Sequence, residues 1–317
     1  MKTALLFPGY SSQYVGMGKE LYDEYRVIQE YFEEASNCVN VNFVKLCFAS
    51  SDTELSKLAH AYMSLFLIGS SIFALLKEHG IIPDVVAGYN NGEMTALFAG
   101  GCFSFPDGLY LLNKFSSFYQ EALDSMDISM IRILGKTTKE VEQICRLVTK
   151  NKNDLAIAFY DGHYDHVVVG SRDNIGLLHN ALETAEHVTV EYPALEIGLH
   201  SHFMNDSVEQ FKIYLEKVDF KDENIPMISG IDGSIVTRGD DIKERFIQHF
   251  LEPFKFTAII DALKDYDYII ISAPSTSLAK KIKEYYPEKN IVTIEKEGDV
   301  EALKDLLQKD TKTETEK

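Results

Sequence analysis

The chain has 317 residues, of which 45% are hydrophobic and 25% are charged, and its formal net charge is −18. A chain of this length can bury a substantial core, and the composition is that of an ordinary globular protein. The excess of negative charge argues against nucleic acid as a partner, because phosphate contacts dominate such binding. No apolar run approaches the roughly 20 residues that a membrane span needs, so no membrane association is expected.

The cysteines and the N-terminus bear on the compartment. Cys38, Cys47, Cys102 and Cys145 are scattered without the spacing of a metal or disulfide motif. The chain enters a strand-like segment at Thr3 without the pattern of a signal peptide. Together these observations favour a reducing, cytoplasmic setting.

In chain order, the first predicted elements are a strand and several helices. Residues 3–7 form a short apolar strand, residues 9–13 a turn, and residues 19–35 a helix. Residues 53–80 have apolar side chains at helical spacing, which is typical of a helical pair packed against a core.

A sharp strand–turn–helix segment follows. The apolar run at residues 85–87 predicts a buried parallel strand, and Gly88 and Gly92 bracket the turn into a helix of small residues. This is the spacing of a nucleophile elbow, in which glycines avoid collisions at the turn. The central residue is Asn90, which tolerates a strained backbone and can cap the helix, but an amide is no nucleophile. The elbow is therefore predicted to be structurally intact and chemically silent.

Motif-like segments occur at residues 6–21, 88–93 and 199–201. They resemble, in this order, the Phe-Pro-Gly-Gln-Gly-Ser-Gln signature with its following Gly-Met-Gly, the Gly-His-Ser-Leu-Gly-Glu elbow and the Phe-His-Ser of the malonyl-CoA:acyl-carrier-protein transacylase family. That family includes the acyltransferase domains of fatty-acid and polyketide synthases, and the similarity extends from about Lys2 to about Val292. It implies an α/β fold class, with an α/β-hydrolase-like parallel-sheet core and an inserted ferredoxin-like subdomain.

After residue 124 the predicted order of strands and helices changes. Residues 125–192 have the expected element order β-α-β-β-α-β, which is that of a ferredoxin-like unit. We therefore expect an α/β-hydrolase-like core of residues 1–124 and 193–305, the ferredoxin-like insert at 125–192, and a disordered polar tail at 306–317.

A loop in this insert mixes histidine with aspartate. Asp161, His163, Asp165 and His166 are residue types that ligate metals. Loops of this kind are far more often solvated, and the spacing names no metal, so no metal site is predicted.

The resemblance assigns catalytic roles around the elbow. It implies that the backbone N–H groups of Tyr10 and Asn91 form an oxyanion hole, and that His200 is the base for a serine nucleophile. Asn90 stands at the position of that serine. His200 is then either a structural histidine bonded to Asn90 or a base for a water molecule or a bound thiol.

The resemblance also points to Tyr89, Phe115, Gly230 and His249 as substrate-pocket positions. Phe115 aligns with the arginine that would pair with the free carboxylate of a malonyl group. A phenyl ring cannot make this pair, so malonyl specificity is not expected and an apolar or filled pocket fits better. Gly230 and His249 stand where the family has an asparagine and a glutamine.

Three hypotheses follow. The first is a transacylase-like pseudoenzyme of fatty-acid or polyketide biosynthesis, without the serine nucleophile and the malonate-binding arginine, that associates with an acyl-carrier protein or a synthase. It needs no cofactor, although coenzyme A or a phosphopantetheine thioester could be its ligand. The second is an active acyltransferase or acyl-thioester hydrolase in which His200 acts as the base without a serine ester. The third is a homo-oligomeric structural protein without carrier binding, its site filled by Tyr10, Tyr89 and Phe115.

Overall fold

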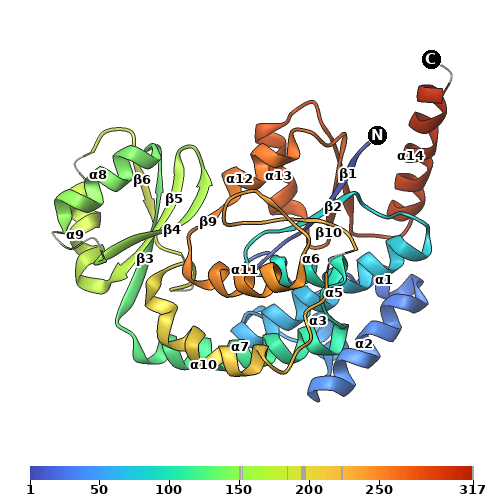
Figure 1. Cartoon of the computed structure of the whole chain (residues 1–317), viewed down its shortest axis with the longest axis horizontal. Helices are drawn as coiled ribbons and strands as arrows, with labels where there is room; N and C mark the ends of the chain where they lie inside the picture. The colour runs from blue at the N-terminus through green and yellow to red at the C-terminus, as the bar shows by residue number, and fades with distance from the viewer. Residues whose placement is uncertain (150, 152, 184, 194–197, 223, 316–317) are drawn as a thin grey trace.

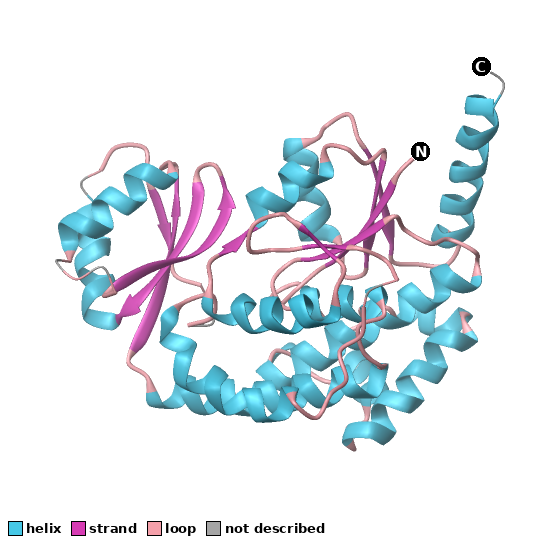
Figure 2. Ribbon diagram, viewed as in Figure 1, coloured by secondary structure: helices cyan, strands magenta, loops and turns pink. Residues whose placement is uncertain are grey.

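The computed structural model describes residues 1–149, 151, 153–183, 185–193, 198–222 and 224–315. Two β-sheets of unequal size are arranged along the long axis of the molecule, and helices surround both (Figures 1 and 2). The α/β fold class expected from the sequence is confirmed.

The larger sheet has six strands in the order β11-β10-β1-β2-β7-β8. All neighbouring strands are parallel except β7 and β8. β1 and β10 are buried along their whole length, which explains why they are continuous apolar runs without alternation. The strands are β1 (Thr3–Phe7), β2 (Val85–Gly88), β7 (Met227–Ile228), β8 (Ile235–Val236), β10 (Tyr268–Ser272) and β11 (Asn290–Ile294).

Most helices belong to the half of the molecule that contains this sheet (Figure 1). The single helix expected at 19–35 is broken at Tyr25, whose backbone is extended between α1 and α2. The helices are α1 (Lys19–Glu24), α2 (Arg26–Val39), α3 (Phe43–Ala49), α4 (Asp52–Leu55), α5 (Leu58–Glu78), α6 (Gly92–Gly100), α7 (Phe105–Ser125), η1 (His202–Met204), α10 (Asn205–Leu215), α11 (Gly239–Leu251), α12 (Phe256–Leu263), α13 (Thr276–Tyr285) and α14 (Asp299–Thr315).

The longest apolar helix, α5, lies in the centre of the core. In the described part of the chain it is the one helix that is long and apolar enough to cross a membrane. The sequence was expected to contain no apolar run of that length. In this fold 83% of the most apolar 18-residue stretch of α5 is buried, and the helix packs against α2, α6 and α7. A helix that is apolar on all sides is expected in such an interior position.

The smaller sheet has the strand order β6-β3-β5-β4-β9. Its first four strands are antiparallel, and with α8 and α9 they have the connectivity and strand order of a ferredoxin-like unit. The unit has its own apolar core beneath the two helices. Its elements are β3 (Ile128–Leu134), α8 (Thr138–Val148), β4 (Leu155–Gly162), β5 (Asp165–Ser171), α9 (Arg172–Glu183) and β6 (Thr189–Glu191), and β9 (Phe254–Lys255) joins them.

The structure differs from the expected chain division in two places. β9 comes from the segment assigned to the core, yet it pairs in parallel with β4 and ties the two parts together. The predicted disordered tail at 306–317 is wrong for residues up to 315, because α14 continues through them from buried anchors at Val300 and Leu303. Residues 316–317 lie outside the described residues.

The parallel strands place the candidate site. The turn after β1 and the turn after β2 meet at the carboxyl ends of these neighbouring strands, where ligands bind in open α/β sheets. The second sheet approaches the same place through β4, whose Phe159 ring lies against the ring of His200.

Candidate active site

The turn between β2 and α6 has the backbone geometry of an elbow. Asn90 is in the left-handed region, with φ of 53°, and only 4% of it is exposed. A Cβ on Gly88 would lie 2.0 Å from the backbone nitrogen of Glu93, and one on Gly92 would lie 2.3 Å from the carbonyl oxygen of Phe7. Both positions therefore need glycine, because no larger residue fits between the strand and the helix.

The side chain of Asn90 does not cap α6, contrary to the expectation from the sequence. It faces the fully buried His200, whose Nε2 lies 3.3 Å from Asn90 Oδ1. On its other side His200 Nδ1 lies 2.6 Å from the carbonyl oxygen of His249. The structure thus brings together the two residues that the sequence analysis placed at the nucleophile and base positions.

These contacts set the proton positions on His200. Burial lowers the pKa of His200 well below its usual value, and nearby His249 lowers it further, so the imidazole is neutral. A carbonyl oxygen only accepts hydrogen bonds, so Nδ1 carries the proton and Nε2 is the acceptor. Rotating the amide of Asn90 by 180° exchanges its oxygen and nitrogen, and Nδ2 then donates to Nε2. In that arrangement Asn90 holds His200 as the hydroxyl of a serine would.

A buried glutamate contacts His249, whose ring lies beside that of His200. Glu93, from the first turn of α6, places Oε2 3.0 Å from Nδ1 of His249, and the two side chains are 1% and 3% exposed. Gly230 borders this pair, since a Cβ there would lie 3.2 Å from Glu93 Oε2 and 2.4 Å from the ring of Phe254. Phe254 therefore fills the space that a side chain at position 230 would occupy.

The two expected oxyanion-hole residues are also neighbours. The N–H of Tyr10 donates to the side-chain carbonyl Oδ1 of Asn91 at 2.5 Å. The hydroxyl of the Tyr10 ring donates to the carbonyl oxygen of Ser56 at 3.0 Å. The Tyr10 amide therefore has a partner from within the protein.

The inner pocket beside the elbow is filled by aromatic rings. Phe115 stacks on Phe250 with 4.2 Å between ring centroids, and Tyr62, Tyr119 and Phe211 surround the pair. The remaining cavity, which Asn91 and His249 also border, has a volume of about 10 Å³. That is room for a single water molecule at most.

A second hollow lies on the outer side of the turn after β1, with a volume of about 330 Å³. Two ion pairs lie in its wall, one between the smaller sheet and α13 and one within the smaller sheet. Asp161 of β4 accepts from the Tyr89 hydroxyl at 2.7 and 2.9 Å and lies 2.5 Å from Lys281 Nζ of α13. Asp165 of β5 makes a two-bond contact with the Arg132 guanidinium. We call this hollow the outer cleft.

Proton positions in the outer cleft follow from these contacts. Burial raises the pKa of Tyr89 well above its usual value, and the Asp161 carboxylate raises it further, so the phenol remains a donor. Burial also raises the pKa of Asp165, but the hydrogen bonds from Arg132 and the charge of Lys281 outweigh it and hold that pKa below its usual value. Asp165 is therefore ionised and paired with the Arg132 guanidinium.

The residues considered as metal ligands are used in other ways. Asp161 and Asp165 are paired with cations, and His166 Nε2 lies 2.9 Å from the hydroxyl of Thr138. Within the described ranges, no group of three His, Cys, Asp or Glu side chains is arranged to hold a metal ion.

Comparison with known proteins identifies the family. Residues 4–316 match the acyl transferase domain family. The chain belongs to this family. It is 32% identical over 265 residues to the malonyl CoA-acyl carrier protein transacylase of Bacillus subtilis (strain 168), a match that covers 83% of both chains.

Solved structures share the fold of this acyl transferase domain. A malonyl CoA-acyl carrier protein transacylase from Clostridium perfringens has a TM-score of 0.91 at 22% identity, and the match covers 99% of this chain and 100% of that one. A malonyl-transacylase solved in complex with a type II polyketide synthase acyl-carrier protein has a TM-score of 0.89 at 19% identity, covering 95% and 98%.

Not every predicted pocket residue of this acyl transferase domain borders the inner pocket. Phe115 and His249 do, whereas Tyr89 points into the outer cleft and Gly230 is covered by Phe254. Phe250, which stacks on Phe115, was not predicted from the sequence, although its apolar position after His249 on α11 could have indicated it.

Lys281 and Arg132 were not predicted from the sequence either. They lie on α13 and β3, far from the elbow in the sequence, and no local motif marks them.

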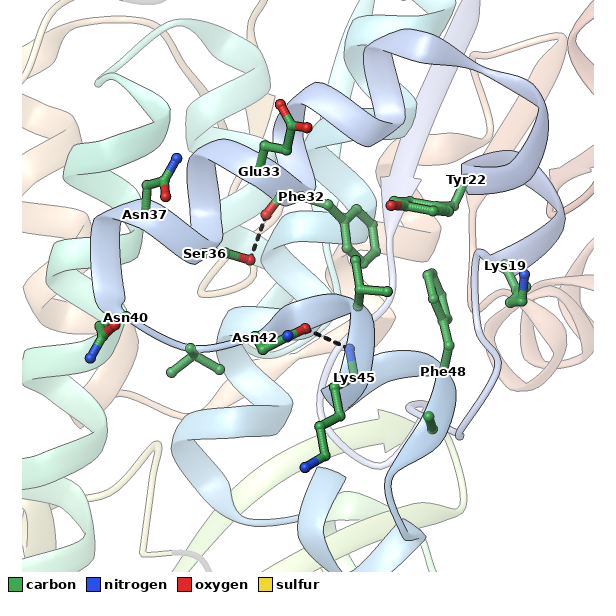
Figure 3. Close-up of a pocket in the computed structure, with 13 residues that line it drawn as sticks. Lys19, Tyr22, Phe32, Glu33, Ser36, Asn37, Asn40, Asn42, Lys45 and Phe48 are labelled. Atoms are coloured by element: carbon green, nitrogen blue, oxygen red, sulfur yellow. Dashed lines mark hydrogen bonds between the residues drawn. The ribbon is translucent and has the colours of Figure 1, made fainter.

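Another hollow in the described part of this acyl transferase domain lies elsewhere. It is a groove of about 940 Å³ between α2 and α3, with Tyr22, Phe32 and Phe48 on its floor and Lys19 and Lys45 at its rim (Figure 3). The hydrogen bonds drawn as dashed lines in Figure 3 join residues close together in the sequence, such as the bond that Asn42 Oδ1 accepts from the Lys45 N–H. The groove includes none of the residues described above as the candidate active site.

Proposed function

We propose that this acyl transferase domain is a non-acylating relative of the malonyl-CoA:acyl-carrier-protein transacylases. In this proposal it acts in the cytoplasm, where it binds an acyl-carrier protein or a synthase component of fatty-acid or polyketide biosynthesis without taking up the acyl group. The observation that carries the proposal is Asn90, which occupies the central position of an intact elbow and faces the base His200.

The chemistry of Asn90 supports the absence of an acyl-enzyme. A carboxamide has no hydroxyl that His200 could deprotonate, so no ester can form at this position. In comparable catalytic units, removal of the serine lowers turnover by roughly 10⁶-fold and leaves about 10³ to 10⁴ over water. Such a remainder is too small for a transacylase that supplies a biosynthetic pathway.

The inner pocket supports the same conclusion. A malonyl carboxylate placed against Phe115 would be buried without a cation, which costs several kcal/mol. The stack of Phe115 on Phe250 also occupies the space that an acyl group would need.

The relatives and the outer cleft support carrier binding. The Bacillus subtilis relative is a malonyl CoA-acyl carrier protein transacylase, and one structural neighbour was solved with an acyl-carrier protein bound. The outer cleft, with about 330 Å³ and polar walls, is of a size and chemistry that fit part of a phosphopantetheine or coenzyme A chain. This ligand is part of the proposal, and no resident cofactor is invoked.

A second candidate function is thioester hydrolysis or transfer with His200 as the base. The hydrogen bond from His200 Nδ1 to the His249 carbonyl favours it, because the bond leaves Nε2 able to accept a proton. Against it, His200 is fully buried and its Nε2 already faces Asn90.

The test measures binding and turnover on the same samples. Wild-type protein is titrated with holo-acyl-carrier protein by calorimetry, and malonyl transfer from malonyl-CoA to that carrier is followed in parallel. We expect binding without transfer. Transfer above the rate of the enzyme-free control would contradict the proposal. Thioester turnover that is abolished by His200→Ala but spared by Asn90→Ala would establish the second candidate instead.

A further inference from the structure

The side chain of Asn91 occupies a position with a chemical meaning that the proposed function does not use. Its carbonyl Oδ1 accepts a hydrogen bond from the Tyr10 N–H at 2.5 Å, and Asn91 as a whole is only 8% exposed. We infer that Asn91 is a built-in occupant of the oxyanion hole, its amide carbonyl taking the place of a substrate thioester carbonyl. This inference rests on the proposed function, because it explains how the site of a non-acylating relative is kept closed.

The backbone fixes Asn91 in this role. Asn91 has helical dihedral angles, φ of −64° and ψ of −10°, and its backbone carbonyl oxygen accepts from the Met94 N–H at the start of α6. Across from it, a Cβ on Gly9 would lie 2.1 Å from the carbonyl oxygen of Tyr89 and 3.0 Å from Asn91 Oδ1. The turns after β1 and β2 are therefore in direct contact, and the Asn91 side chain is held between them.

An internal carbonyl competes directly with a substrate. Both are neutral sp² oxygens that accept from the same N–H, but the Asn91 oxygen is already bound and loses no translational freedom. A thioester would have to displace it before the Tyr10 N–H could stabilise a developing oxyanion. Asn90 removes the nucleophile and Asn91 removes a donor, so the site is blocked at two separate points.

A structural role alone would give a different result. If Asn91 only satisfied a buried N–H, replacing it would change stability without changing the reactivity of a restored nucleophile. The two interpretations therefore separate in a background where a serine has been introduced at the elbow.

The first experiment compares acylation rates of four variants: Asn90→Ser, Asn90→Ser/Asn91→Leu, Asn90→Ser/Asn91→Ala and Asn90→Ser/Asn91→Asp. Each is incubated with acetyl-CoA, whose acyl group is small, and the acyl-enzyme is followed by intact-mass spectrometry. In the step being measured, the introduced hydroxyl oxygen attacks the thioester carbonyl carbon while His200 Nε2 takes its proton. The carbon–sulfur bond then breaks, and coenzyme A leaves as the thiol with that proton.

We expect the Leu and Ala double variants to be acylated about 10²-fold faster than Asn90→Ser, which is the value typical of one oxyanion-hole donor. The Asp double variant should stay as slow as Asn90→Ser, because its carboxylate still accepts from the Tyr10 N–H. The Ala variant guards against misfolding caused by the larger leucine. Equal rates for the single variant and the Leu and Ala double variants, or no acylation of any variant, would overturn the inference.

A second measurement does not depend on acylation. Hydrogen exchange of the Tyr10 amide is compared between the wild type and Asn91→Leu, and loss of protection in the variant is expected. Unchanged protection would overturn the inference even if the proposed function holds. The proposed function fails separately, if the wild type itself becomes acylated by acetyl-CoA.

Discussion

The inner pocket and the outer cleft lie on two sides of the same elbow, and they differ in what fills them. The cavity that remains in the inner pocket has a volume of about 10 Å³ and lies between aromatic rings around Phe115. The outer cleft has a volume of about 330 Å³, and its wall contains the ion pairs of Asp161 with Lys281 and of Asp165 with Arg132. A ligand thus has room outside the elbow but none beyond it, which is the arrangement expected of a protein that binds a carrier without accepting its acyl group.

The largest effect is expected from emptying the inner pocket. Phe115→Ala removes a ring that is stacked on Phe250 and 2% exposed, so the free energy of unfolding should fall by about 3–5 kcal/mol in urea denaturation. Phe118→Ala, on a partly exposed face of the same helix, is the matched control and should cost less. A loss for Phe115→Ala no larger than for Phe118→Ala would show that the pocket is not tightly packed.

The backbone of the elbow, which both hollows share, is tested next. Gly88→Ala places a Cβ 2.0 Å from the Glu93 nitrogen, and the forced backbone shift should lower the free energy of unfolding by about 3 kcal/mol. Gly176→Ala is the control, because a Cβ there meets nothing within 4 Å and α9 should become about 0.5–1 kcal/mol more stable. Equal stability changes in the two variants, measured by denaturant titration, would refute the tight elbow.

The outer cleft should respond less strongly. Lys281→Ala leaves the buried Asp161 carboxylate with the Tyr89 hydroxyl but without its cation, so a loss of about 2 kcal/mol is expected. The exposed neighbour Lys280, which lines the same cleft, serves as the control, and Lys280→Ala should change stability by less than about 0.5 kcal/mol. Thermal or urea unfolding measures both, and a neutral Lys281→Ala would mean that the pairing of Asp161 with Lys281 adds nothing to stability.

The smallest effect concerns the buried His200. Burial lowers the pKa of His200 from 6.5, so below pH 6.5 the unfolded chain binds a proton that the folded chain does not. The contribution of His200 to the free energy of unfolding is therefore fully present above pH 6.5. It is lost as the pH falls below 6.5, by up to about 1.4 kcal/mol per pH unit for one group.

His200→Asn tests this dependence, because asparagine tolerates the φ of 61° at this position. The variant should show a shallower fall of unfolding free energy below pH 6.5 than the wild type. His166, whose pKa burial also lowers, leaves a residual slope of the same sign. Identical slopes in urea denaturation series would contradict a neutral, buried His200.

How far the sequence predicts this molecule depends on the range of each interaction. The elbow glycines, the strand at 85–87 and the β-α-β-β-α-β order are local patterns, and the structure contains all of them. The hydrogen bond from Tyr10 to Asn91 joins residues 81 positions apart, so the family resemblance implied two backbone donors at these residues but not that a side chain occupies one.

The same limit explains two other differences. The pairing of Asp161 with Lys281 depends on how the second sheet meets α13, which no local motif encodes. The tail was expected to be disordered from its polar composition, but α14 is anchored by Val300 and Leu303 at its start, and a helix once begun extends at little cost.

The most direct measurement is the intact mass of the wild-type protein after incubation with excess malonyl-CoA, with Asn90→Ala as the matched control. Because a carboxamide stands at the centre of the elbow, the mass of both proteins should stay unchanged. A malonyl adduct on the wild type, mapped by peptide analysis to Ser201 or any other side chain of the chain, would contradict the account.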